Sequence, residues 1–178
     1  MTPEEKAARA RQRKIEKSKE WSPGHHRSVV AKVFQQMVRA EAALKPAGHE
    51  VAVVNGVIAT VWRNVGECVC VTCGQVAPWT TSTGSMQTGH FLASRCAAIL
   101  FEESGVAPQC VTCNDLEHGA QQRYRMWMEH VRGPEAIERL VQLKNTPWQY
   151  SREELVDLHI AFAARLKRAK AELLRLAE

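Results

Sequence analysis

Apolar residues recur at helical spacing in two long segments, one near each end of the chain. From His25 to Leu44 they return every three or four positions, and Lys45-Pro46-Ala47-Gly48 ends the pattern. Near the other end, Ser151-Arg152-Glu153-Glu154 forms a capping box that opens a helix running to about Ala177. We expect two long helices, each with one buried face. The buried stripe of the second consists of Leu155, Leu158, Phe162, Leu166, Ala169 and Leu173.

Between these helices the period of the pattern changes. β-Branched runs at 51–54 and 57–62 flank Asn55-Gly56, the pair best suited to a type I′ turn, and they predict a β-hairpin. Residues 121–131 and 134–144 have helical patterns separated by Gly133, and Pro134 suits the first turn of the second helix. These elements predict an α+β fold.

The first twenty residues have a different character. They contain seven Lys or Arg and four Glu with few apolar residues, which predicts a frayed or exposed helix. Such a helix can serve as an arm along a phosphate backbone, and a solvated tail is the alternative. We therefore expect a basic arm and a helix in residues 1–48. Residues 49–120 would hold the hairpin and a central core, and 121–178 a C-terminal helical region, in one compact domain.

Length and charge narrow the class of protein. The chain has 178 residues, of which 45% are hydrophobic, enough for a real core. Its formal net charge of +5 favours a polyanionic partner. The N-terminus is charged from Glu4 onward with no apolar signal-peptide region, and no run is long and apolar enough to span a membrane. We expect a cytoplasmic protein.

The most specific signal is a pair of Cys-x-x-Cys motifs. Cys70-Val71-Thr72-Cys73 precedes Gly74, and Cys110-Val111-Thr112-Cys113 precedes Asn114. Each motif can fold into a knuckle that offers two thiolates, and four thiolates make a closed structural zinc site. Disulfides or buried thiols are the alternative, but disulfides belong to oxidising compartments. The remaining cysteines, Cys68 and Cys96, are expected to be small buried residues.

Three further polar residues lie in or beside this region. His90 stands between the two motifs, at the expected end of a strand. If a helix begins near Cys113, Asn114 and His118 project from one face of it, because they are four residues apart. Together they can hold one cation opposite His90. The alternatives are a structural, hydrogen-bonded His90, a solvated His118 and an Asn114 that only closes the second knuckle.

This order of motifs resembles the HNH nucleases of the ββα-metal type, and more closely the NinG/Rap recombination endonucleases of lambda-like phages. The resemblance covers about residues 65–175. It is carried by Cys70-Val71-Thr72-Cys73-Gly74, Gly89-His90-Phe91, Phe101-Glu102-Glu103, Gln109-Cys110-Val111-Thr112-Cys113-Asn114, Gly119, Tyr124-Arg125, Gly133-Pro134-Glu135 and Tyr150–Glu154.

The resemblance implies a zinc-stapled, HNH-like ββα-metal core and endonucleolytic cleavage of branched DNA, such as Holliday junctions and D-loops, in phage recombination. It implies His90 as general base, with Asn114, His118 and Glu103 around a catalytic Mg²⁺ or Mn²⁺ ion. A phage protein of this kind acts in the bacterial cytoplasm. A symmetric junction has two scissile strands, which favours a homodimer. The candidate DNA-contacting residues are Arg95, Arg123, Tyr124 and Arg125.

Two positions depart from the family pattern. Gly105 stands where an HNH site has the asparagine that orients its histidine, and Gln87-Thr88-Gly89 provides no carboxylate before His90. These departures favour a rival interpretation, a non-catalytic zinc module that binds DNA or another recombination protein. A third possibility is an HNH enzyme that nicks ordinary duplex DNA.

Overall fold

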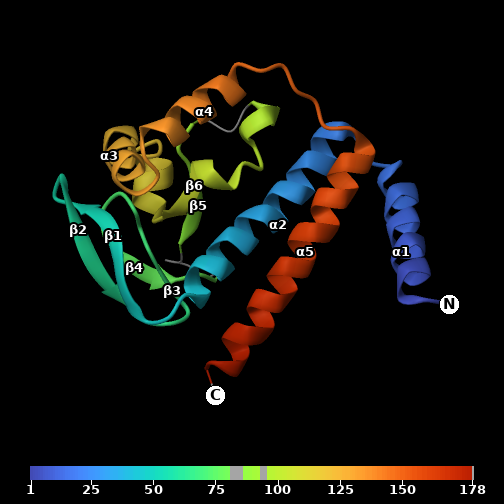
Figure 1. The fold of residues 1–178 in the computed structure, drawn as a ribbon, viewed down its shortest axis with the longest axis horizontal. Coiled ribbons are helices and arrows are strands. Elements are labelled where there is room, and N and C mark those ends of the chain that lie inside the picture. The colour runs from blue at the N-terminus through green and yellow to red at the C-terminus, as the bar shows by residue number, and fades with distance from the viewer. Residues whose placement is uncertain (81–85, 93–95, 178) are drawn as a thin grey trace.

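Two long helices form the centre of the molecule. The structure, a computed structural model, describes residues 1–80, 86–92 and 96–177. Helices α2 (Pro23–Leu44) and α5 (Arg152–Arg175) pack along one another, as Figure 1 shows. Their apolar faces meet around Phe34, whose ring centroid lies 5.0 Å from that of Phe162. Ser151 and Glu154 form the expected capping box at the start of α5. Both long helices are confirmed.

Helix α1 (Pro3–Ser18) lies against the flank of α5 (Figure 1). The expected exposed helix is confirmed, because only Ile15 and Ser18 of α1 are buried. The guanidinium of Arg11 holds both carboxylate oxygens of Asp157, at 2.5 and 2.8 Å. Arg152 also donates to the carbonyl of Ser18. The attachment of α1 is therefore small, because it buries only two residues and its ion pair is half-exposed, where such pairs contribute little.

Three two-stranded antiparallel sheets make up the β structure of the described residues. β1 (Gly48–Val54) pairs with β2 (Val57–Arg63), and the turn residues Asn55 and Gly56 have φ of 50° and 80°, as a type I′ turn requires. The second sheet is β3 (Glu67–Val69) with β4 (Val76–Pro78). The third is β5 (Gln87–His90) with β6 (Val106–Gln109), which places His90 at a strand end as expected.

The first Cys-x-x-Cys motif joins two of these sheets. The backbone N–H of Val53 in β1 donates to the carbonyl of Val71 at 2.9 Å. The N–H of Val71 in turn donates to the carbonyl of Pro108 in β6 at 3.1 Å. The motif therefore lies between the hairpin and the β5–β6 pair and ties them together through the main chain.

Two shorter helices complete the fold, and the first of them packs against the hairpin. α3 (Gln121–Val131) and α4 (Pro134–Lys144) have the expected bounds. Trp127 of α3 donates its indole N–H to the carbonyl of Val51 in β1 at 2.9 Å. The remaining short turns are η1 (Ala97–Ile99), η2 (Glu103–Gly105) and η3 (Thr112–Leu116). The fold is mixed α+β, and no helix in the described part of the chain is long and apolar enough to cross a bilayer.

Candidate functional site

The four cysteines of the two motifs converge on one point. Their Sγ atoms lie within 4.8 Å of one another, and three of the four side chains are buried. The Sγ atoms of Cys73 and Cys110, one from each motif, are 3.7 Å apart. A tetrahedral zinc with Zn–S bonds of about 2.3 Å needs S–S edges of roughly 3.8 Å. The donor set and its spacing therefore fit a structural zinc ion held by Cys70, Cys73, Cys110 and Cys113.

The backbone turns both motifs into similar knuckles. The N–H of Gly74 donates to the carbonyl of Cys70 at 2.9 Å, and the N–H of Asn114 donates to that of Cys110 at the same distance. Gly74 has a φ of +79°, and an added Cβ would lie 2.6 Å from a methyl group of Val54. The turn after the first motif therefore requires glycine for two reasons, its backbone conformation and the close approach of β1.

Nearby donors contact three of the thiols. The hydroxyl of Thr72 lies 3.2 Å from the Sγ of Cys70, and the N–H of Cys113 donates to the Sγ of Cys110 at 3.5 Å. Arg123, on the first turn of α3, donates to the Sγ of Cys113 at 3.5 Å and also contacts the carboxylate of Glu117. Sequence reasoning did not find this role for Arg123, because only the fold brings α3 to the second knuckle. Such donors offset the negative charge that four thiolates give a zinc centre.

The two remaining cysteines are separate from this centre. Cys68 is buried with its thiol against the carbonyl of Arg39 at 3.4 Å, and burial raises its pKa to about 12. It is the small buried residue that the sequence predicts. Cys96 is only partly buried and donates to the carbonyl of Lys144 at 3.1 Å. The expectation of full burial is therefore wrong for Cys96.

His90 ends β5 with its imidazole largely enclosed. Its Nε2 lies 3.2 Å from the carbonyl oxygen of Leu100. A carbonyl can only accept, so Nε2 carries the proton of the neutral ring and Nδ1 keeps the free lone pair. Burial lowers the pKa of His90, partly opposed by this hydrogen bond, so the ring is neutral near pH 7. The carbonyl of Leu100 thus orients the ring. In an HNH site an asparagine has this role, at the position where this chain has Gly105.

Asn114 does not lie beside His90. Successive side chains of a strand point to opposite faces. Thr88 bonds to the carbonyl of Gln35 in α2, and His90 shares its face of β5. Gln87 points to the other face, where its amide oxygen accepts from Asn114 at 2.5 Å. The contacts of Asn114 are therefore with Gln87 and Asp115, and its expected grouping with His90 around one cation, which these contacts do not support, stays a prediction.

His118 is also separated from the expected group. The helix predicted to begin near Cys113 is instead one π-helical turn, η3, that ends at Leu116. His118, Gly119 and Ala120 then adopt positive φ angles of 50°, 88° and 46°, and the N–H of Gly119 donates to the carbonyl of Cys113 at 2.9 Å. This left-handed run interrupts the helix, so Asn114 and His118 do not share a helical face. His118 is exposed to solvent.

A small polar cluster lies where the ion was expected. The amide nitrogen of Gln87 donates to Asp115 at 2.8 Å, and the amide of Asn114 reaches the other oxygen of the same carboxylate at 3.3 Å. Sequence reasoning did not include Asp115, although it directly follows the predicted ligand. In the described ranges, the four cysteines form the one group of three or more His, Cys, Asp or Glu close enough to share an ion.

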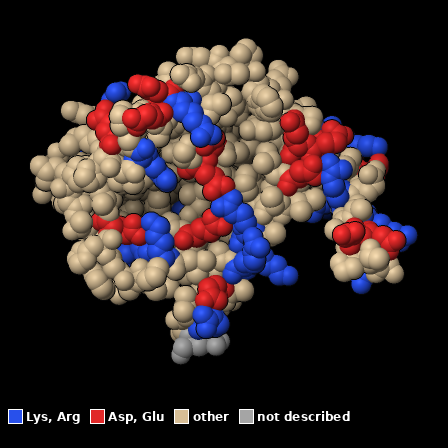
Figure 2. Space-filling model, in the orientation of Figure 1, with Lys and Arg blue, Asp and Glu red and all other residues tan. Residues whose placement is uncertain are grey.

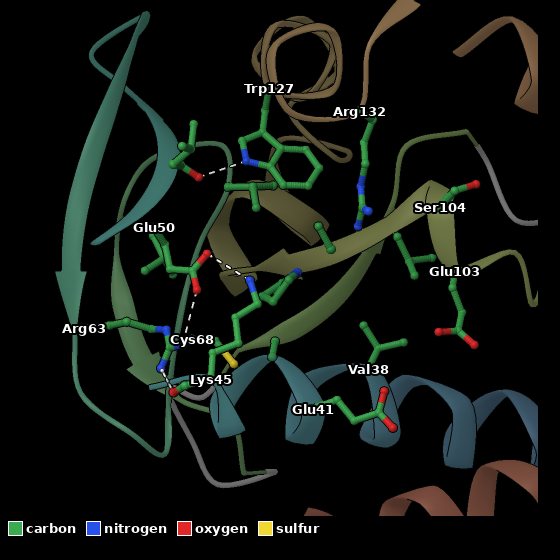
Figure 3. A pocket seen from close by; sticks show the side chains of 17 residues that line it. Val38, Glu41, Lys45, Glu50, Arg63, Cys68, Glu103, Ser104, Trp127 and Arg132 are labelled. Carbon is green, nitrogen blue, oxygen red and sulfur yellow. Dashed lines mark hydrogen bonds and ion pairs between the residues drawn. The ribbon is translucent and has the colours of Figure 1, made fainter. Parts of the chain in front are cut away.

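Glu103 is engaged elsewhere. It forms an ion pair with Arg165 of α5, with Oε2 2.9 Å from Nη2, and this contact lowers the pKa of the carboxyl. It lines a cavity of about 330 Å³ between α2, α3, β1 and β6, shown in Figure 3. The other two carboxylates of this cavity also have basic partners, Glu50 with Arg63 and Lys45, and Glu41 with Arg165. Glu103 is therefore not a ligand to an ion at His90 in this structure.

The candidate DNA-contacting residues have different surroundings. Tyr124 is fully buried and donates to the carbonyl of Gly89 at 3.2 Å, so its expected DNA contact is wrong. Arg123 is committed to Cys113 and Glu117. Arg125 is exposed and paired with Glu129 at 2.8 Å. Arg95 lies outside the described residues.

Comparison with known proteins gives one positive finding. A family model described as "Bacteriophage Lambda NinG protein" matches residues 2–172 of this chain. That range includes the basic arm and hairpin as well as both Cys-x-x-Cys motifs. No curated protein and no solved structure matches.

Proposed function

Because the chain belongs to the NinG family of bacteriophage lambda, we propose that it is an endonuclease that cleaves branched DNA in phage recombination, with His90 as its general base. The family places the chain in a phage, and the zinc centre provides a rigid support for the β5–β6 pair. The proposal combines this family membership with the chemistry available at His90.

The state of the His90 imidazole is the observation that carries the proposal. A general base needs a neutral ring with one lone pair free to take a proton from water. The Leu100 carbonyl holds Nε2–H, which leaves Nδ1 for that proton, and burial keeps the ring neutral near pH 7. An uncommitted surface histidine would have neither a fixed ring orientation nor a lowered pKa.

The resemblance also implies a catalytic Mg²⁺ or Mn²⁺ ion, which would stabilise charge on the scissile phosphate. The residues predicted to hold it at His90 do not fit that role in this structure. Asn114 bonds to Gln87 on the opposite face of β5, Glu103 is paired with Arg165, and His118 is not on the expected helix.

This separation favours a second candidate function, a non-catalytic zinc module that binds branched DNA or another recombination protein. An enzyme that nicks ordinary duplex DNA is distinguished from both by its substrate preference. For cleavage of both strands of a symmetric junction we also propose a homodimer.

A cleavage assay decides between these functions. A labelled four-way junction and a matched linear duplex are incubated with zinc-loaded protein and Mg²⁺ or Mn²⁺, and parent protein is compared with His90→Ala. We expect the parent to cut the junction, and the variant to bind it without cutting. Junction binding without cleavage by the parent under either ion would establish the binding module. Equal cutting of junction and duplex would establish the duplex-nicking enzyme.

Glu129→Gln is the matched control, because among the described residues this side chain of α3 pairs only with Arg125. It should cut like the parent. Sedimentation of the parent alone and with junction then measures whether the cutting species is a dimer.

A further inference from the structure

We propose that the outward face of α1 binds the phosphate backbone of one nucleic-acid strand through a basic stripe, defined as Lys6, Arg9, Arg13 and Lys17. This inference rests on the proposed DNA-binding function and adds the surface that engages the backbone. It concerns a part of the molecule that neither the zinc centre nor His90 occupies.

Helical geometry places the four cations on one face. Their sequence spacings of three, four and four residues keep them aligned along the helix. The residues that attach α1 to the body lie on the opposite side of the same helix: Arg11 and Ile15 through their side chains, and Ser18 through its backbone carbonyl. Docking against α5 therefore leaves the basic stripe facing solvent, and all four residues are exposed.

The cations of the stripe differ from most arginines elsewhere in the described residues, because they have no ion-pair partner. Among the described residues, none of its four members has an ion-pair or hydrogen-bond partner for its side chain. By contrast, Arg11, Arg125 and Arg165 are each matched to a carboxylate. Two acids of α1 lie one helical turn from stripe residues, and both have other partners: Glu5 accepts from the N–H of Thr2 at 2.7 Å, and Glu16 is held by Lys19 at 2.8 Å. Four uncompensated cations thus remain available to an external anion.

The alternative basic surface, along α5, is more nearly neutral. Arg165 lies between Glu41 and Glu103, and Arg175 is paired with Glu172. Figure 2 shows basic and acidic side chains alternating along this part of the surface, whereas α1 stands at the edge of the molecule. Lys167 and Arg168 of α5 also have no ion-pair partner among the described residues, so α5 keeps some unpaired charge, but the stripe aligns four unpaired cations on one helix face.

The dimensions of the stripe suit a linear polyanion. Lys6 and Lys17 are eleven residues apart, so the stripe is about 16 Å long at roughly 1.5 Å per residue. One DNA strand places a phosphate about every 3.4 Å along the duplex axis, so this length covers roughly five phosphates. Contacts of this kind position a nucleic acid without reading its bases.

The dependence of affinity on salt tests the stripe directly. Each phosphate neutralised by the protein adds about 0.9 to the slope of log K against log salt for duplex DNA. The quadruple variant Lys6→Gln, Arg9→Gln, Arg13→Gln and Lys17→Gln keeps good helix formers at every position. Binding of a fluorescent four-way junction is measured from about 50 to 200 mM KCl. We expect the magnitude of the slope to fall by about 3.6, which is 0.9 for each of the four cations removed.

A control variant separates local contact from net charge. The control carries four exposed substitutions outside the stripe: Lys32→Gln, Arg139→Gln, Lys144→Gln and Arg175→Gln. Both quadruple variants lower the formal net charge from +5 to +1. The control slope should stay within about one of the parent value. Equal slopes for the two variants would overturn the proposal. Zinc content and helicity by circular dichroism confirm that both variants fold.

The same experiment separates this inference from the proposed endonuclease. A parent that cuts junctions, with a slope unaffected by the stripe, would retain the enzyme and reject the stripe. A parent that binds through the stripe but never cuts would support the stripe and reject the enzyme. Absence of junction binding by the parent would reject both.

Discussion

Arg123 donates to the Sγ of Cys113 at 3.5 Å, which places a positive charge against one of the four cysteines that can hold a zinc ion. Arg123→Gln should make that thiolate more reactive, because the charge that offsets the four thiolates is lost. We expect release of zinc to a chromogenic chelator to become about tenfold faster. Arg125→Gln is the control, since Arg125 lies on the same helix but pairs with Glu129. Equal release rates for the two variants would show that Arg123 does not protect the centre.

Zinc content should separate the six cysteines into two groups. Cys70→Ala removes one of four converging ligands and should lose most of the zinc, with a lower thermal stability. Cys68→Ala removes a thiol that contacts the carbonyl of Arg39 and should keep one zinc per chain. Elemental analysis of the purified variants gives the stoichiometry. Full zinc occupancy in Cys70→Ala would mean that the ion has a different ligand set.

Cleavage by the proposed enzyme should depend on pH through His90. Burial lowers the pKa of His90 below the usual value of about 6.5, and a general base acts only when unprotonated. The single-turnover rate on a four-way junction should therefore be level near pH 7 and fall as the pH falls through this lowered pKa. A rate that already declines well above pH 6.5 would assign the titration to another group.

Two histidines with lowered pKa values, His26 on α2 and His159 on α5, should make the free energy of unfolding depend on pH. His26 is 2% exposed, and its pKa is lowered by burial and by the charges of Arg152 and His25. The pKa of His159 is also lowered, by burial and then by Lys14 and His26. Below about pH 6.5 the unfolded chain binds more protons than the folded one, so stability falls as the pH falls toward the folded-state pKa.

Thermal unfolding at pH 7.5 and 5.5 measures this effect. His26→Gln should reduce the difference in melting temperature between the two pH values, whereas His130→Gln, an exposed residue of α3, should leave it unchanged. His26 is buried against Trp21, whose ring centroid lies 5.4 Å from that of the imidazole.

Gly89 should tolerate no side chain. An added Cβ would lie 1.8 Å from the amide oxygen of Gln109, whose nitrogen is held by Thr72 and the carbonyl of Gly119. Gly89→Ala should therefore lower the free energy of unfolding by about 2–3 kcal/mol. Gly24→Ala, in the first turn of α2 with open space around it, should be neutral or stabilise by up to about 1 kcal/mol. Chemical denaturation of both variants makes the comparison.

The sequence predicts those parts of the fold that depend on local patterns. The type I′ turn at Asn55-Gly56, the capping box at Ser151 and the buried stripe of α5 are all found, because each is determined by residues close together in the chain. The four-cysteine cluster is also found, since the spacing of each pair limits how its thiols can point.

The arrangement around His90 could not be predicted in the same way. Which face of β5 carries His90 depends on its register with β6, a tertiary property. The helix expected after Cys113 fails at His118 because three consecutive residues adopt left-handed backbone conformations, two of them not glycine. The contacts of Arg123 and Asp115 could not be predicted either, because they depend on how α3 and β5 pack against the second knuckle.

Val71, in the first knuckle, is bonded through its main chain to both Val53 of the hairpin and Pro108 of β6, so the central core joins segments that leave the ribosome at different times. The β1–β2 hairpin needs only neighbouring residues and can form early on the ribosome. The metal centre must wait until Cys113 has emerged, because its two halves are separated by 36 residues in the sequence. A nascent chain stalled before Cys110 should thus bind zinc weakly through its first knuckle alone, so full metal binding depends on completion of the central core.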